Sequence, residues 1–318
     1  MTAHLAQPAK QRGVAVITAL LLTTLAITIV SSLFWQQQVQ VRSIENLRLQ
    51  LQQQWVLRGA LDWASLILRE DASHSSVDNL DEPWAVTLEE TRLDQYLEGS
   101  SADADITNAT LSGGISDAQA RYNLTNLCPN GIIDYAAVAV FARLLSNASF
   151  DPALSLATAE LMVESLKSLE DETTDDSNQS APQPIRLVQT NDLLAVPGFT
   201  TQMLGDLQDY VIFLPQVTPV NINTAPVEVL AALVDTFSQS DASSMVKSRD
   251  KASFRNLADF NNRLPGKILS ISPKLASVST NYFLINGAIR MSRAGLEMQA
   301  LFERKGGNSK LIWIREHQ

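Results

Sequence analysis

Three patterns of hydrophobic and polar positions follow one another along this chain, and each predicts a different structure. Residues 14–34 are uniformly apolar, without a charge, proline or glycine. Around residues 57–68 the apolar positions recur at helical spacing, and residues 282–316 contain runs typical of strands. The chain is therefore expected to begin with a long helix and to end in a β-sheet.

The apolar run Val14–Phe34 predicts a transmembrane helix, because its length at helical rise is roughly 30 Å, the thickness of a hydrocarbon core. A secretory signal would be shorter and followed by a small-residue cleavage site, whereas Trp35 and three glutamines follow here. A buried core helix usually keeps a polar face. No proline intervenes before Pro83, so the helix is expected to continue from Val14 to about Leu68.

The residues before the helix predict its orientation and its processing. Lys10 and Arg12 should keep the leader, residues 1–13, in the cytoplasm and place the C-terminal part outside it. A basic leader that ends in Gly13 before an unbroken apolar helix resembles a type IV prepilin-like signal. That resemblance implies cleavage after Gly13 on the cytoplasmic side and N-methylation of Val14.

Thr18 departs from the prepilin-like pattern, in which the fifth mature residue is usually Glu. A carboxylate in a bilayer is costly unless it meets a partner charge, which in pilins is the N-terminal amine of the neighbouring subunit. Thr18 can instead satisfy its hydroxyl on its own helix backbone. We interpret Thr18 as the mark of a subunit that starts or caps a fibre.

Strand-like runs lie on both sides of a helical block. Residues 113–127 read as a strand that leads into helices. Near the C-terminus, residues 282–291 and 295–304 read as strands, and residues 305–310 read as a hairpin turn before a third strand at 311–316. In the second of these strands the same face carries Leu296, Met298, Ala300 and Phe302.

These patterns predict an α+β protein with an inserted domain. A pilin-like α/β head with an antiparallel sheet should be built from residues 69–127 and 271–318. The intervening residues, 128–270, should form a large all-α domain.

Two segments of the predicted α-domain resemble tandem helix–hairpin–helix units: DLLAVPGF at 192–199 and VNINTAPVEVLAAL at 220–233. In the second, Asn223 or Thr224 is expected to cap a helix that begins near Pro226. Such units often bind DNA, so a membrane-anchored DNA-binding or DNA-uptake protein is the alternative function. The absence of Lys and Arg between Arg186 and Lys247, and a net charge of −10, favour a protein-packing module and no nucleic acid.

The sequence offers no pattern for catalysis. With histidine only at 4, 74 and 317, Cys128 has neither a zinc-ligand spacing nor a histidine partner and is expected to be a small buried residue. In DEPWA, residues 81–85, we interpret Asp81 and Glu82 as part of a turn before the packed indole of Trp84, rather than as catalytic carboxylates. No catalytic residue is assigned.

An acidic connector, residues 170–184, contains the weak candidates for a metal site. Carboxylate oxygens are the ligands that Ca²⁺ prefers, so Glu170, Asp171, Asp175 and Asp176 could bind it. A solvated acidic loop is the favoured interpretation of this segment.

Six stretches in order along the chain resemble one family, the general secretion pathway protein K family. This family contains the large minor pseudopilin of type II secretion. The matching stretches are RGVAVITALLL, DEPWA, DAQARYNLTNL, LLAVPGF, VNINTAPVEVLAAL and NYFLINGAIRMSRAGLEMQALFER. The family's lack of the usual fifth-residue Glu agrees with Thr18. Many members carry an Asp-rich segment associated with calcium, and this chain lacks that pattern.

The resemblance implies a structural function rather than an enzymatic one. It implies a substrate of prepilin peptidase that is anchored by a single span in the inner membrane, with its head in the periplasm. Other minor pseudopilins and the major pseudopilin are the implied partners, and the tip of the pseudopilus is the implied position.

Overall fold

The structure is a computed structural model that describes residues 12–93, 109–171, 186–264, 266, 270–291 and 294–317. The chain divides into two compact units, Met1–Val56 and Leu57–Gln318. Helix α1 (Arg12–His74) supplies residues to both units.

Helix α1 ends later than the sequence predicted. It extends past Leu68 to His74, because the intervening residues contain neither proline nor glycine. At its end the Ser73 hydroxyl donates to the Glu70 carbonyl, and the next turn begins with a backbone bond from Ser75. In the second unit α1 buries the four positions that the helical spacing indicated, Leu57, Leu61, Ala64 and Leu68.

A five-stranded antiparallel sheet forms the head, in the order β1-β2-β7-β8-β9. The strands are β1 (Leu88–Arg92), β2 (Thr110–Asp117), β7 (Tyr282–Met291), β8 (Ala294–Lys305) and β9 (Asn308–His317). The predicted alternation in β8 is confirmed, since its four inward positions, Leu296, Met298, Ala300 and Phe302, are all buried. The hairpin between β8 and β9 is confirmed as well.

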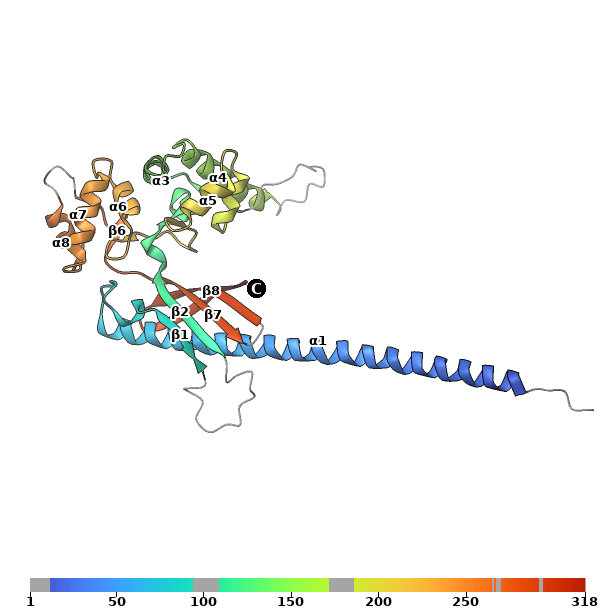
Figure 1. The fold of residues 1–318 in the computed structure, drawn as a ribbon. Coiled ribbons are helices and arrows are strands. Elements are labelled where there is room, and N and C mark those ends of the chain that lie inside the picture. The colour runs from blue at the N-terminus through green and yellow to red at the C-terminus, as the bar shows by residue number, and fades with distance from the viewer. Residues whose placement is uncertain are drawn as a thin grey trace, which may run out of the picture. The chain divides into compact units, whose positions relative to one another are not determined.

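One face of this sheet packs on the C-terminal part of α1 (Figure 1). The short helix η1 (Pro83–Ala85) closes one side of this core with Trp84, which is 1 % exposed. The indole meets the ring of Phe283 edge to face, with 5.2 Å between centroids, and its Nε1 donates to Glu82 at 2.8 Å. The predicted turn followed by a packed indole is therefore confirmed.

The inserted domain separates two strands that pair along the whole length of β2. β2 and β7 pair from Thr110 opposite Arg290 to Asp117 opposite Phe283, although the inserted domain lies between them in the chain. Figure 1 shows its helices in two groups, α3 to α5 and α6 to α8. The elements are η3 (Ala118–Ala120), β3 (Tyr122–Asn123), η4 (Leu124–Leu127), η5 (Pro129–Gly131), α3 (Tyr135–Asn147), α4 (Leu154–Asp171), η6 (Thr190–Ala195), α5 (Thr201–Leu207), β4 (Val211–Ile212), β5 (Val220–Asn221), α6 (Val227–Leu233), α7 (Gln239–Arg249), α8 (Leu257–Arg263) and β6 (Ala276–Ser277).

The hydrophobic core of the inserted domain includes residues on both sides of the predicted range 128–270, whose limits stay a prediction. It begins at Tyr122 and reaches Ala276. Two short parallel pairs hold these ends, β3 with β4 and β5 with β6. Strands of two residues carry no periodicity, so the sequence pattern could not place these limits.

The predicted cap of the helix near Pro226 is wrong. Pro226 itself is the N-cap residue of α6 and makes no side-chain cap bond. Asn223 instead exchanges two bonds with the backbone of Phe254, at 2.8 and 3.0 Å, and the Thr224 hydroxyl donates to Asp117 at 2.6 Å. The side chains of Asn223 and Thr224 therefore bond segments distant in the sequence instead of capping α6.

Adjacent glycines in β2 give a matched test of the sheet. A Cβ on Gly113 would lie 2.5 Å from the backbone oxygen of Asn286, whereas a Cβ on Gly114 would meet Thr87 at an ordinary 3.5 Å. Gly113→Ala should lower the free energy of unfolding by about 1–3 kcal/mol, and Gly114→Ala should have a much smaller effect. Urea unfolding of the full-length chain in detergent, followed by tryptophan fluorescence, measures both. Equal losses of unfolding free energy in the two variants would contradict the pairing of β2 with β7.

Candidate assembly site

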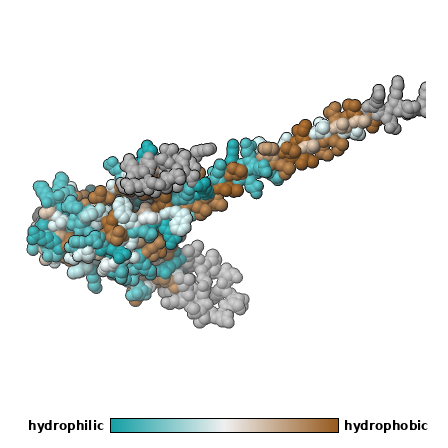
Figure 2. All heavy atoms as spheres, turned by 90° about the horizontal axis from the view of Figure 1, so that it is seen from below, coloured by the Kyte–Doolittle hydropathy of each residue, from teal (hydrophilic) through white to brown (hydrophobic). Residues whose placement is uncertain are grey.

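The N-terminal part of α1 is an apolar surface. Figure 2 shows apolar side chains gathered along this part of the helix. In the described part of the chain, α1 is the one helix long and apolar enough to cross a membrane, and its most apolar window is not buried. The large side chains that are exposed there are Val14, Val16, Ile17, Leu20, Leu21, Leu22, Leu25, Ile27, Ile29, Val30, Leu33 and Phe34. These features agree with a single membrane anchor.

Thr18 satisfies its hydroxyl within its own helix. Its Oγ1 lies 3.0 Å from the carbonyl oxygens of both Val14 and Ala15. Thr24 bonds the preceding turn in the same way. Gly13 and Val14 lie in the first turn of α1, and their processing stays a prediction. The Thr18 hydroxyl is therefore satisfied by its own helix backbone, and Thr18 offers no charge to a neighbouring subunit.

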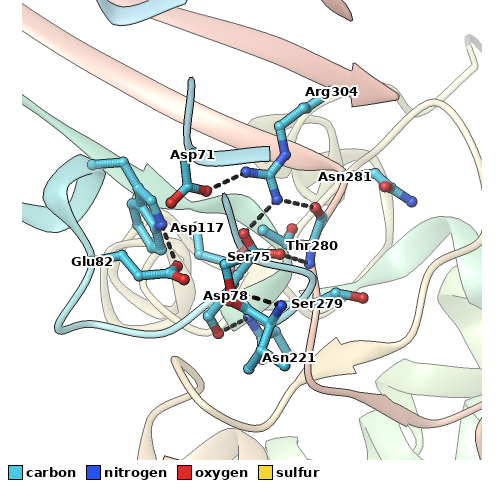
Figure 3. A network of polar contacts seen from close by, with 12 residues as sticks. Asp71, Ser75, Asp78, Glu82, Asp117, Asn221, Ser279, Thr280, Asn281 and Arg304 are labelled. Atoms are coloured by element: carbon cyan, nitrogen blue, oxygen red, sulfur yellow. Dashed lines mark hydrogen bonds and ion pairs between the residues drawn. The ribbon is translucent and has the colours of Figure 1, made fainter. Parts of the chain in front are cut away.

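A second polar site lies at the other end of α1, where three segments meet around Arg304 of β8 (Figure 3). Its Nη1 donates to Asp71 in the last turn of α1, at 2.6 Å. Its Nη2 donates to Asp78 and to the carbonyl of Thr280. The guanidinium also lies over the ring of Phe283, 4.6 Å from the centroid. All three charged side chains are almost completely buried.

The same network continues into the inserted domain. Asp78 accepts a bond from the Thr280 amide at 2.7 Å, and its backbone carbonyl accepts one from Asn221 at 3.1 Å. Asn221 also donates to Asp117 at 2.8 Å, beside the bond from Thr224. Asp117 ends β2 and Thr280 precedes β7, so the network holds both places where the chain passes between head and inserted domain.

Burial dominates the electrostatics of this network. Desolvation raises the pKa of Asp71 despite its bond to Arg304, and it likewise raises the pKa of Glu82. It raises the pKa of Asp117 to about 6, although several hydrogen bonds oppose the shift. Removing one partner of a buried ion pair typically costs about 3–5 kcal/mol, so Arg304 is expected to be essential for stability.

Sequence reasoning missed Arg304, Asp78 and Asp117. One signal was present: Arg304 stands two residues after Phe302 and so continues the buried face of β8. A charge on an inward-facing position needs a buried partner. The alternation could therefore have indicated an ion pair, but not that Asp71 and Asp78 would form it.

The predicted calcium residues stay untested. Glu170 and Asp171 end α4, while Asp175 and Asp176 lie outside the described residues. Among the described residues, one group of carboxylates has its oxygens within 4.8 Å of one another: Asp71, Asp78 and Glu82. Arg304 and the Trp84 indole already donate to these oxygens, and the guanidinium supplies the positive charge that a cation would bring.

The helix–hairpin–helix-like segments and the cysteine pack into the core of the inserted domain. Leu193 and Phe199 flank the first hairpin turn, and both are buried, as is Leu230 in the second segment. Cys128 is also buried, as predicted, and burial raises the pKa of its thiol.

An apolar groove runs beside α1 within the second unit. It has a volume of about 240 Å³ and lies between α1, the segment 83–88, β2 and β7. Trp63 and Val86, which are 54 % and 74 % exposed, stand among its lining residues. A large exposed apolar side chain beside a groove is typical of a protein-contact surface.

Comparisons with known proteins point to one family. Two family models, both described as type II secretion system protein K, match residues 120–216 and 220–279. Type II secretion system protein K of Pseudomonas aeruginosa is 27% identical over 95% of this chain and 92% of its own length. The protein of the same name from Klebsiella pneumoniae is 24% identical, over 93% and 94%.

A solved structure shares the fold. It is a chain in the crystal structure of the GspK-GspI-GspJ complex from the enterotoxigenic Escherichia coli type 2 secretion system. The match has a TM-score of 0.65 at 20% identity and covers 88% of this chain and 99% of that chain. The α+β fold with a long N-terminal helix is therefore confirmed.

Stability should fall as the pH rises from about 4 to about 6. In that range the folded chain holds a proton on Asp117 that the unfolded chain has released, because burial raises the folded pKa from 3.8 to about 6. This contribution is complete below about pH 4, is lost above about pH 6, and amounts to about 3 kcal/mol. Burial also raises the pKa values of Asp71 and Glu82, so these two groups likewise make the stability fall as the pH rises. Asp117→Asn should therefore reduce the slope without abolishing it.

The measurement is urea unfolding of the full-length chain in detergent across that pH range. Asp206→Asn, which removes an exposed carboxylate from α5, is the control and should keep the wild-type slope. An unchanged slope in Asp117→Asn would contradict the assignment.

Proposed function

This chain belongs to the protein K family of type II secretion systems, and we propose that it is the minor pseudopilin that starts or caps the periplasmic pseudopilus. In this role it assembles with other subunits rather than catalysing a reaction. The fibre that it starts supports the export of folded proteins across the outer membrane.

The N-terminal residues support an inner-membrane anchor with a periplasmic head. The basic leader stays in the cytoplasm under the positive-inside rule, and the apolar part of α1 spans the bilayer. Prepilin peptidase then cleaves after Gly13 and methylates Val14, which becomes the mature N-terminus.

The main support for a position at the tip is that residue 18 is Thr and not Glu. A subunit added beneath another must bring a carboxylate to the amine above it, because an unpaired charge in hydrocarbon costs several kcal/mol. Thr18 bonds its own backbone and offers no such charge. The amine of Val14, in contrast, can be met by the Glu of a subunit arriving below. The chain is therefore suited to begin a fibre and poorly suited to continue one.

The proposed partners are other minor pseudopilins at the tip and the major pseudopilin below. The name of the similar Escherichia coli structure describes a complex with GspI and GspJ, which supports two such partners. Their long helices would pack along residues 36–68 of α1. The inserted domain would clash laterally inside a shaft, which supports a single copy per fibre.

Cleavage after Gly13 tests the proposed prepilin-type signal. Gly13→Val should leave the full-length precursor in the inner membrane, because the peptidase needs the small residue before the cut. Gly59→Ala lies in the same helix, where an added Cβ meets nothing within 4 Å, and should be processed normally. Intact-mass spectrometry identifies the N-terminus and its methyl group. A normal mature protein from Gly13→Val would contradict the prepilin-type signal.

Crosslinking tests the tip position. Single cysteines near Val14 and at Trp63 should trap other pseudopilins and never a second copy of this chain. Cys128 is buried and should not compete. As a matched control, a cysteine at exposed Ser240 in the inserted domain should give no crosslinks to the shaft. Abundant ladders of this chain would show a shaft subunit and overturn the proposal.

A further inference from the structure

A polar cleft lies between the inserted domain and the face of the sheet opposite α1. Its volume is about 370 Å³. The inserted domain contributes Arg121 and residues 188–191, and the sheet contributes Gln299 of β8 and Arg315 of β9. Gln299 alternates with the α1-facing Met298, which places the cleft on the second face of the sheet.

Arg121 lines this cleft together with Asp209, its ion-pair partner. Its side chain is 22 % exposed, and its Nε is buried without a hydrogen-bond partner in the described part of the chain. The carboxylate of Asp209 lies 3.9 Å away, too far for a hydrogen bond, and that side chain is 75 % exposed. Burial lowers the pKa of Arg121, so its charge carries a desolvation cost that Asp209 offsets only in part.

Arg249 shows how a buried arginine is satisfied elsewhere in the same domain. Its Nε is also buried without a partner, but its Nη1 donates to the carbonyls of Ile222 and Ala225, at 2.9 and 2.5 Å. Those bonds stabilise the segment before α6. Among the described residues Arg121 has the long ion pair with Asp209 but no hydrogen bond of this kind, so its guanidinium can bind a further anionic group that enters the cleft.

The opposite wall holds a second guanidinium in place. Arg315 lies over the ring of Trp313, 4.2 Å from the centroid, and both residues line the cleft. Attraction of the guanidinium to the ring face restricts the movement of the Arg315 side chain. The lining also includes the apolar side chains of Phe213 and Leu284 and the carboxylate of Asp209.

We propose that this cleft binds an acidic peptide segment, with its carboxylate held by Arg121 and Arg315. A guanidinium can bind a carboxylate through two parallel N–H···O bonds, and charge-assisted bonds of this kind are stronger than those between neutral groups. The apolar part of this polar lining, which includes Phe213 and Leu284, suits the carbon atoms of a peptide better than a bare inorganic anion. This site is separate from Thr18 and α1, so it goes beyond the role in fibre initiation.

The test uses the full-length chain in detergent micelles, labelled with ¹⁵N-arginine. The probe is the peptide acetyl-Gly-Phe-Glu-Gly-amide, and its matched partner carries Gln in place of Glu. The buried Nε–H resonance of Arg121, assigned by its loss in Arg121→Gln, should shift saturably with the Glu peptide and not with the Gln peptide.

Variants locate the site. Arg315→Gln should weaken binding roughly tenfold or more, since it removes one of the two charge-assisted contacts. Arg290→Gln removes an exposed arginine from β7 outside the cleft and should leave the affinity unchanged. Because Arg315 is not part of a core ion pair, its variant tests the site even if Arg121→Gln fails to fold, and Arg121→Lys, which keeps the charge, then serves to assign the resonance.

The proposal would be overturned by no response to the Glu peptide, by an equal response to the Gln peptide, or by equal losses of affinity in Arg315→Gln and Arg290→Gln. A response to inorganic phosphate as strong as that to the Glu peptide would also overturn it, because the cleft would then be a general anion site.

Discussion

The buried charge of Arg304 is the interaction on which the second unit depends. A guanidinium removed from water must be matched by carboxylates and carbonyls, because an unpaired buried ion costs several kcal/mol. Asp71 at the end of α1 and Asp78 in the following loop supply the matching charges. The end of β8 is thereby held against the end of α1, and the apolar face of the sheet covers the helix.

This ion pair also sets the position of the inserted domain. Asp78 bonds Thr280 and Asn221, and Asn221 bonds Asp117, so the two strands that lead into and out of the insertion meet at one point. A large domain can be inserted into a small sheet only if its two ends lie close together. The polar network satisfies that requirement, and the two-residue parallel pairs continue it into the domain.

The two units of the chain contribute different kinds of surface to the proposed function. The first offers an apolar helix whose hydroxyls are satisfied internally, which suits a bilayer and gives no charge to a neighbour. The second offers two concave surfaces that could bind other molecules, the apolar groove beside α1 and the polar cleft around Arg121. The first unit therefore supplies the anchor and part of the proposed helix-packing surface, and the second unit supplies the groove and the cleft.

The sequence alone determined what local periodicity encodes. The apolar run and the spacing of Leu57, Leu61, Ala64 and Leu68 predicted α1, and the alternation in β8 predicted the sheet. The hydroxyl bonds of Thr18 also follow from a threonine in a helix. The tertiary structure alone decided which carboxylates meet Arg304, how Asn223 and Thr224 are used, and where the insertion begins and ends. Those features depend on partners distant in the sequence, and a local pattern carries no information about such partners.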